Sequence, residues 1–173
     1  MVRGFSVLEL IITLIVIGVL LIGAAPSFQF GSKKIKAQRA AQEMYALLMQ
    51  TKAESILRNT PLWIHFEGLP QQAVSGGWRV KVANKASLRD PEVSILWQLA
   101  GEPFQGVELA LNHPGDQIKF DHLSGMVLSS GTITLSPYSR QTGQIEIRTH
   151  SASGRIVVCQ SGEMELGLGA CPK

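Results

Sequence analysis

The sequence has little charge of either sign and no strong excess of one. Of its 173 residues, 16 are Lys or Arg and 13 are Asp or Glu, for a net charge of +3 at pH 7. A dedicated nucleic-acid-binding domain carries a much larger basic excess. The composition therefore argues against that class and leaves only a local basic cluster to consider.

Sequence motifs of the common enzyme classes are absent. The sequence contains neither a Gly-X-Ser-X-Gly elbow nor a phosphate-binding loop. Its four histidines are scattered and lack ligand spacing such as His-Glu-X-X-His: His65, His113, His122 and His150. His122 lies close to Asp121 and Ser124, but neighbours in sequence need not converge in space. We expect turn and strand-end residues here, with no catalytic residue, no metal and no cofactor; an enzyme would instead need a deep polar pocket.

What the sequence does contain is a long apolar run near its start. Residues 10–25 carry no charge, and with residues 5–8 they reach the roughly 20 residues that a helix needs to cross a bilayer. Only Glu9 interrupts the run. A carboxylate costs roughly 2.5–3.5 kcal/mol near the centre of a membrane helix, and less nearer an end. Glu9 is therefore a functional candidate that needs a partner.

Three kinds of N-terminus fit this run to different degrees. A cleaved secretory signal has a shorter apolar core, and Pro26 directly after two alanines disfavours cleavage there. A plain membrane anchor explains the length of the run but not Glu9. The third is a type IV prepilin leader, because residues 3–9, Arg-Gly-Phe-Ser-Val-Leu-Glu, resemble that signal closely. Pro26 also matches a proline common at this place in pilin helices.

The prepilin resemblance implies specific processing of the N-terminus. In that family a short basic leader ends in glycine, a prepilin peptidase cleaves after it, and the new first residue is N-methylated. Here the cleavage would fall between Gly4 and Phe5. The positive amine of Phe5 in one subunit would then pair with Glu9 of a neighbour, since a buried ion pair is tolerable whereas one unpaired charge costs several kcal/mol. The alternative is a Glu9 carboxylate that snorkels to the membrane surface.

Two cysteines, Cys159 and Cys171, lie close together near the C-terminus. An even number of cysteines after a membrane-targeting segment indicates one disulfide. A loop this short would contribute roughly 3 kcal/mol in the chain-entropy description and would hold the Gly-rich residues 162–169. The alternative is two unpaired thiols. A metal site is disfavoured because no histidine or third cysteine lies nearby.

The orientation in the membrane rests on conflicting signals. One basic residue, Arg3, precedes the apolar run, and four follow it: Lys33, Lys34, Lys36 and Arg39. The positive-inside rule alone would leave the C-terminal part in the cytoplasm. The cysteine pair and the prepilin resemblance favour the opposite side. We expect a single-pass protein of the bacterial inner membrane with its C-terminal domain in the periplasm.

After Pro26 the sequence predicts a second helical stretch. Residues 32–58 carry an apolar stripe at helical spacing, with Ser32 as a plausible N-cap and Asn59-Thr60-Pro61 as the stop. The stripe consists of Ala37, Ala41, Met44, Leu48 and Ser55, widened by Ala40, Leu47, Ile56 and Leu57. Continuous with the apolar run, it gives one long helix with a bend or loosening near Gly31.

Beyond residue 60 short alternating runs predict strands. They are residues 62–66, 78–82, 107–111, 117–120, 132–135, 144–148 and 155–158, separated by Gly- and Pro-containing turns. Residues 84–103 are less regular and fit either a long loop or an extra strand pair. The prediction is an α+β, pilin-like chain whose long N-terminal helix packs on an antiparallel β-sandwich or curled sheet. Its parts are a leader (1–4), a membrane or filament-core helix (5–25), an amphipathic continuation (26–59) and a periplasmic β domain (60–173).

Three further stretches resemble the minor pilins and pseudopilins grouped as FimT and GspH. They are residues 25–28, residues 50–59, and a strand signature formed by residues 120–125, 131–135 and 154–156. The Cys159 and Cys171 pair resembles the C-terminal disulfide of the FimT side of the group. The resemblance implies a non-enzymatic subunit that primes or caps a type IV pilus. The alternative is a GspH-type pseudopilin of the type II secretion system. Its implied partners are other pilins, prepilin peptidase and the inner membrane.

DNA is a weaker partner candidate. Some FimT relatives carry a Gly-Arg-X-Arg motif near the C-terminus, whereas residues 154–157 here are Gly-Arg-Ile-Val. Binding through the remaining basic residues would be driven by phosphates and sensitive to salt. The candidate contacts are Arg140, Arg148, His150, Arg155 and Lys173. The alternative is that they are solvated strand and loop charges.

Overall fold

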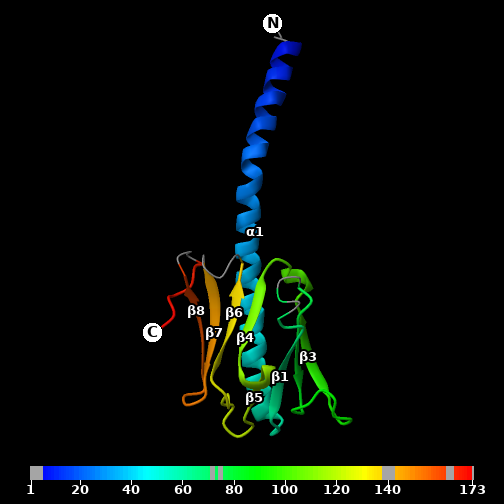
Figure 1. Ribbon diagram of the computed structural model, residues 1–173, viewed down its shortest axis with the longest axis vertical. Coiled ribbons are helices and arrows are strands. Elements are labelled where there is room, and N and C mark those ends of the chain that lie inside the picture. The colour runs from blue at the N-terminus through cyan, green and yellow to red at the C-terminus, as the bar shows by residue number, and fades with distance from the viewer. Residues whose placement is uncertain (1–5, 71–72, 74–75, 138–142, 163–165, 173) are drawn as a thin grey trace.

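The chain combines one long helix with two antiparallel sheets, as Figure 1 shows. The computed structural model describes residues 6–70, 73, 76–137, 143–162 and 166–172, with only the backbone for 22–30. The elements within these residues are α1 (Val7–Leu57), β1 (Leu62–Glu67), β2 (Arg79–Ala83), β3 (Ile95–Ala100), the 3-10 helix η1 (Glu102–Phe104), β4 (Glu108–Asn112), the 3-10 helix η2 (Pro114–Asp116), β5 (Gln117–Phe120), β6 (Gly131–Ser136), β7 (Gln144–His150) and β8 (Arg155–Ser161). The predicted α+β class, with a helix packed on antiparallel sheets, is confirmed.

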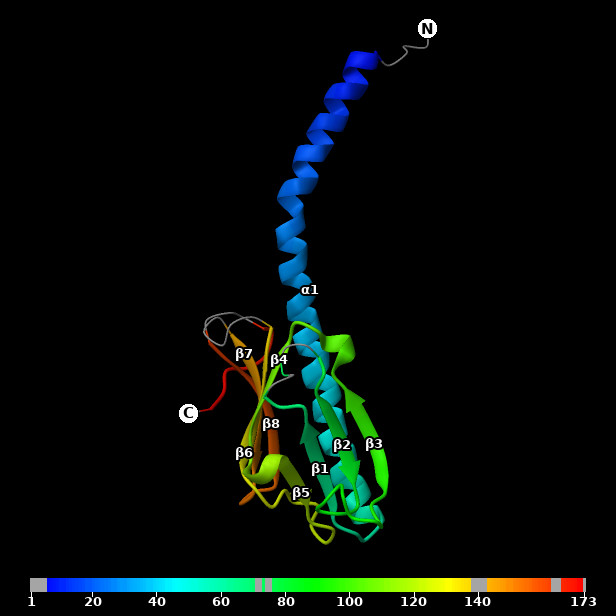
Figure 2. The ribbon, with the colours of Figure 1, turned by 45° about the vertical axis from the view of Figure 1, so that its right-hand side comes forward.

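The helix α1 is continuous over 51 residues. It begins after Ser6, whose hydroxyl oxygen accepts a hydrogen bond from the N–H of Leu8 at 3.3 Å. Ser32, which we expected as an N-cap, lies inside the helix, and the helix passes Gly31 without a break. In Figure 2 the part of α1 beyond the sheets curves gently. The apolar run and the stretch after Pro26 therefore form one continuous helix, as the sequence predicts.

The end of α1 is closed by a left-handed residue. Asn59 has a φ of 49°, and its N–H donates to the carbonyl of Ile56. The N–H of Thr60 donates to the carbonyl of Ser55 at 3.2 Å. This pair of bonds is the Schellman arrangement, which satisfies carbonyls that the helix end would leave without partners. Asn tolerates the left-handed conformation, so the predicted stop at residues 59–61 is correct and has a physical cause.

One face of the lower half of α1 is buried. Its residues are Ala37, Ala40, Ala41, Met44, Leu47, Leu48, Thr51 and Ser55. The hydroxyl of Thr51 donates to the carbonyl of Leu47, and that of Ser55 to the carbonyl of Lys52, so neither needs a distant partner. Ile56 and Leu57 are 46% and 80% exposed, and their assignment to this stripe was wrong. Apolar spacing alone did not reveal that the last turn leaves them open to solvent.

The two sheets share one core with this face of α1. Their strand orders are β3-β2-β1-β5 and β4-β6-β7-β8, and every pairing is antiparallel. Alternate residues of the strands point inward, as a sheet with one buried face requires. Examples are Ile64 of β1, Val80 of β2, Ile133 of β6 and Ile147 of β7, all without exposed surface. Residues 84–103 contain one extra strand, β3, rather than the strand pair considered above.

A buried histidine joins the ends of three strands in the second sheet. His113 is 7% exposed, and its Nε2 lies 3.2 Å from the hydroxyl of Thr149. Thr149 in turn donates to the carbonyl of Ser129 at 3.1 Å. Gly131 gives the ring its space, because a Cβ there would lie 2.5 Å from the ring carbon Cδ2. The neutral ring satisfies this network by donating from Nε2 to Thr149.

The buried histidine predicts a pH-dependent stability. Burial lowers the pKa of His113 to about 4 from an ordinary 6.5. Only the unfolded chain takes up this proton between pH 6.5 and 4, so the free energy of unfolding should fall across that window as the pH is lowered. The loss should reach at most about 3 kcal/mol. Urea unfolding of the detergent-solubilised chain, followed by tryptophan fluorescence, measures it.

A His113→Leu variant provides the control for this slope. It is expected to be less stable at pH 7, because Thr149 loses a partner, but to lose less additional stability between pH 6.5 and 4. An equal slope in both proteins would show that another group causes the pH dependence.

Candidate functional site

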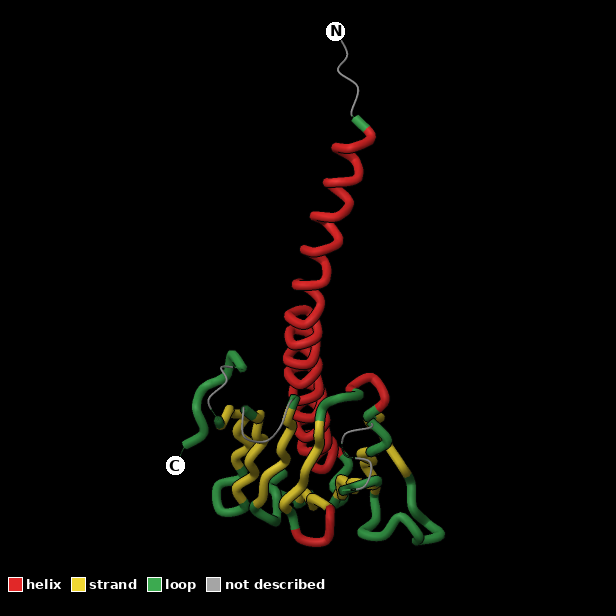
Figure 3. Tube along the Cα trace, turned by 45° about the horizontal axis from the view of Figure 1, so that its top comes forward, coloured by secondary structure: helices red, strands yellow, loops and turns green. Residues whose placement is uncertain are grey.

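The upper part of α1 projects beyond the sheets (Figures 1 and 3), and its side chains form an apolar surface. Its large apolar side chains are each 49–75% exposed: Val7, Leu8, Leu10, Ile11, Ile12, Leu14, Ile15, Val16, Ile17, Val19, Leu20 and Leu21. Monomeric soluble proteins rarely expose continuous apolar patches above a few hundred Å². This projecting surface is therefore the main candidate for an interaction surface.

Among the described residues, no helix combines the length and the apolar character that a bilayer crossing demands. The predicted span over residues 5–25 stays a prediction. The predicted cleavage site, Gly4 and Phe5, lies outside the described residues.

Glu9 is the acidic residue in the first turn of the projecting helix, and it is exposed. A carboxylate near a helix N-terminus interacts favourably with the helix dipole. Thr13, one turn further along, donates its hydroxyl proton to the carbonyl of Leu10 at 2.8 Å. The hydroxyl of Thr13 is therefore hydrogen-bonded within the helix. The carboxylate of Glu9 instead offers a negative charge to a group outside the helix.

The C-terminal tail is fastened to the sheet by the expected disulfide. Cys159 and Cys171 are bonded, with a Cα–Cα distance of 4.8 Å. The same tail reaches α1: Leu166 is fully buried in the core, and its carbonyl accepts a hydrogen bond from the side-chain amide of Gln38 at 2.6 Å. Leu166 thus packs against α1.

Gln160 holds this tail independently of the disulfide, which sequence reasoning missed. Its side-chain oxygen accepts from the N–H groups of Leu166 (2.7 Å) and Leu168 (3.1 Å). Its backbone N–H donates to Gly169, and its carbonyl accepts from Cys171. The tail therefore extends the edge of β8 by a parallel bridge. An isolated glutamine carries no sequence signal for this role.

A buried carboxylate lies beside the disulfide. Burial would raise the pKa of Glu146, but hydrogen bonds from Ser161 and Arg148, the charge of Arg148 and a hydrogen bond from Gln144 together lower it. The Nε of Arg148 lies 2.8 Å from the Glu146 carboxylate. Glu146 and the two cysteine sulfurs are close enough to suggest a metal site. The disulfide removes that option, because a bonded sulfur is no thiolate ligand.

The structure brings only part of the predicted basic cluster together. Arg148 and His150 lie on one face of β7, and Arg155 lies opposite His150 on β8. Arg148 is already engaged, by Glu146 and by the carbonyl of Pro172 at 2.7 Å. His150 and Arg155 are exposed. Arg140 and Lys173 lie outside the described residues.

The group around His122 forms a turn. The Asp121 carboxylate accepts from the hydroxyl (2.7 Å) and the N–H (2.9 Å) of Ser124, which lower the pKa of Asp121. The ring of His122 lies 3.9 Å from the other carboxylate oxygen. In a catalytic triad the histidine lies between serine and aspartate. Here the serine bonds the aspartate directly, so the geometry is that of a turn following β5.

The double attachment of the tail predicts how it responds to mutation. A Cys159→Ser/Cys171→Ser variant should lose about 3 kcal/mol of unfolding free energy, the chain-entropy contribution of a short loop. Its Leu166 and Leu168 amides should stay protected from hydrogen exchange, because Gln160 still accepts from them. Adding Gln160→Ala should expose both amides.

Hydrogen exchange with mass spectrometry measures the protection of the Leu166 and Leu168 amides. Gln98→Ala on the exposed face of β3 serves as the matched control. If the serine variant alone exposes the tail amides, Gln160 has no independent role.

Comparison with known proteins places this architecture in a family. Residues 40–162 match the family described as Type II transport protein GspH. Two crystal structures of the type IV minor pilin FimU from Pseudomonas aeruginosa (strain PAO1) share the fold. One, in space group P65, has a TM-score of 0.54 at 15% identity and covers 70% of this chain and 90% of FimU. The other, in space group P21, has a TM-score of 0.53 at 14% identity and covers 73% and 90%.

No curated protein sequence matches the chain. The GspH match nevertheless spans most of it, including α1 from Ala40 onward and all eight strands that the described residues form. At 14–15% identity, the similarity to FimU supports a shared fold only. The chain belongs to the GspH family of pilin-like proteins.

Proposed function

We propose that this chain is a minor pilin or pseudopilin subunit that primes or caps a type IV pilus-like filament. The observation that carries the proposal is the projecting half of α1, with its exposed apolar side chains from Val7 to Leu21 and the single carboxylate of Glu9 among them. Such a helix needs apolar surroundings, and a bundle of like helices from neighbouring subunits supplies them. The β domain then stays outside the bundle. The function is one of assembly rather than catalysis.

The proposal includes a membrane stage before assembly. Prepilin peptidase would cleave between Gly4 and Phe5, and Phe5 would be N-methylated. Residues 5–25 would hold the subunit in the inner membrane with the β domain in the periplasm. The disulfide of Cys159 and Cys171 supports an oxidising compartment for that domain.

The alternative is a pseudopilin of the type II secretion system. The family description, Type II transport protein GspH, favours it, and the same helix and β domain would serve there. The name of FimU, a type IV minor pilin, favours the pilus. Both assemblies use the projecting helix, so the partners rather than the fold distinguish them.

Replacing Glu9 tests the assembly role. Glu9→Ala should lower incorporation into the filament at least tenfold, because a neighbour's amine would lose its partner in an apolar bundle. The β domain should stay folded. Mild cross-linking, affinity purification of the tagged chain and mass spectrometry measure the loss and identify the partners.

Glu43→Ala, an exposed glutamate on the same helix, is the matched control. Recovery of pilus subunits assigns the chain to a type IV pilus, and recovery of other pseudopilins and secretin partners assigns it to type II secretion. Normal incorporation of Glu9→Ala would remove the proposed role of this carboxylate.

DNA uptake through the basic face of β7 and β8 is a separate part of the proposal. Because Arg148 is engaged by Glu146, Arg155 is the better candidate for a phosphate contact. Arg155→Glu should abolish retention of DNA at low salt, while Arg89→Glu, at an exposed arginine between β2 and β3, should not. Arg148→Ala is less informative, since it would leave Glu146 buried without its cation.

Gel retention of a short duplex over a range of salt concentrations measures this binding. Equal retention by the wild type and by Arg155→Glu would rule out a DNA contact at this face.

A further inference from the structure

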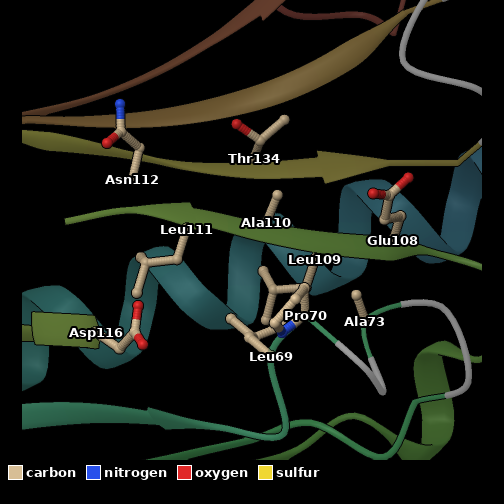
Figure 4. A pocket seen from close by; sticks show the side chains of 10 residues that line it. All are labelled: Leu69, Pro70, Ala73, Glu108, Leu109, Ala110, Leu111, Asn112, Asp116 and Thr134. Carbon is tan, nitrogen blue, oxygen red and sulfur yellow. The ribbon is translucent and has the colours of Figure 1, made fainter.

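Among the described residues, three side chains of metal-ligand type converge at one place. The cavity of about 390 Å³ beside β4 is not that place, because Figure 4 shows its two carboxylates, Asp116 and Glu108, at opposite ends. The place is the pairing of β7 with β8. A carboxylate oxygen of Glu146 and the sulfurs of Cys159 and Cys171 lie there within 4.8 Å of one another. Glu146 is only 7% exposed, so a buried charge is built into this cluster.

The fold holds the two cysteines together even without the bond between them. A disulfide forms by oxidation, so each chain first carries both thiols. Cys159 lies opposite Glu146 in the ladder of β7 and β8. The N–H of Cys171 donates to the carbonyl of Gln160 at 2.9 Å, and the carbonyl of the next residue accepts from Arg148 at 2.7 Å. These contacts involve no sulfur, so the reduced chain keeps two thiols beside the carboxylate.

The carboxylate of Glu146 is oriented as a metal ligand is oriented in proteins. Its Oε1 accepts from the side chains of Ser161 and Gln144, and its Oε2 accepts from Nε of Arg148 at 2.8 Å. These bonds occupy three of the roughly four acceptor positions of a carboxylate, which leaves one on Oε2. Carboxylates that bind metals are usually fixed by such partners.

Two thiolates and a carboxylate suit Zn²⁺ rather than Mg²⁺ or Ca²⁺, which prefer oxygen ligands. In a tetrahedral site with Zn–S of roughly 2.3 Å and Zn–O of roughly 2.1 Å, the ligand atoms lie roughly 3.6–3.8 Å apart. Side-chain rotation can bring atoms already within 4.8 Å to that spacing once the sulfurs are not bonded. The charges also balance, since three negative ligands meet Zn²⁺ and the guanidinium of Arg148. Cys171 is partly exposed and leaves a path from solvent.

We propose that the reduced chain binds one Zn²⁺ through Cys159, Cys171 and Glu146, with a water as the fourth ligand. The ion would hold the C-terminal tail against β8 before the disulfide forms. Oxidation would then release it: the two thiolates give two electrons to an oxidant that carries a disulfide, their S–S bond forms, and the oxidant's sulfurs take up two protons from water. The cluster lies in the β domain, so the proposal does not depend on the role of Glu9.

The test uses the full chain in detergent, reduced with a phosphine under nitrogen. Co²⁺ is the first probe, because thiolate ligands give it a charge-transfer absorption and a tetrahedral site gives it strong visible bands. Competition against a chromophoric chelator then measures the affinity for Zn²⁺. The oxidised chain is a control with the same sequence.

We expect the reduced chain to bind one Co²⁺ through two thiolates, and Zn²⁺ to displace it with a Kd below about 1 μM. The oxidised chain and Cys171→Ser should bind too weakly to compete with the chelator. Glu146→Gln should weaken Zn²⁺ binding at least tenfold. Glu67→Gln is the matched control, because Glu67 is a strand glutamate paired with Lys81, and it should bind as the wild type does. Oxidised glutathione should release Zn²⁺ from the wild type.

Three results would overturn the proposal. The first is the absence of thiolate-to-cobalt absorption in the reduced wild type. The second is equal Zn²⁺ affinity of the wild type and Glu146→Gln, with the near-ultraviolet spectrum of the variant unchanged, which would show that the carboxylate is no ligand. The third is equal binding by the oxidised chain, which would place the ion elsewhere on the protein.

Discussion

The buried face of α1 is the constraint on which the rest of this structure depends. The two sheets form separate ladders, and the lower half of the helix is the apolar wall that both share. Ala37, Ala40 and Ala41 keep that wall flat, so the strands can approach closely, while Met44 and Leu48 fill the space between the sheets. Each such buried large side chain contributes roughly 1.5–3 kcal/mol. Loss of this face would uncover both sheets at once.

Because α1 is continuous, its buried half fixes the orientation of its projecting half. At 1.5 Å per residue, the 51 residues of α1 extend over roughly 77 Å. Because no break in the helix separates its buried and projecting halves, the packing around Met44 also sets the direction of the apolar surface from Val7 to Leu21. The β domain and the interaction surface are thus one mechanical unit, with Glu9 held at its far end.

Much of this arrangement follows from local sequence patterns. Seven strands lie close to the predicted residues, since alternation and glycine turns are short-range signals, and the disulfide followed from two cysteines. What depended on tertiary contacts was missed. Ile56 and Leu57 have helical spacing but no strand above them. Gln160 and His113 act through residues that only the fold brings near. Arg148 was predicted as a DNA contact or a solvated charge, whereas its pairing with Glu146 reflects strand position and partial burial.

The contact between Gln38 and Leu166 has a consequence for how the chain reaches its final form. These residues are separated by 128 positions in the sequence. The core around α1 cannot close completely until the chain has been synthesised beyond Leu166. Such long-range closure slows folding. During that interval the helix stripe stays uncovered, so the nascent subunit is a natural client for chaperones that bind apolar segments.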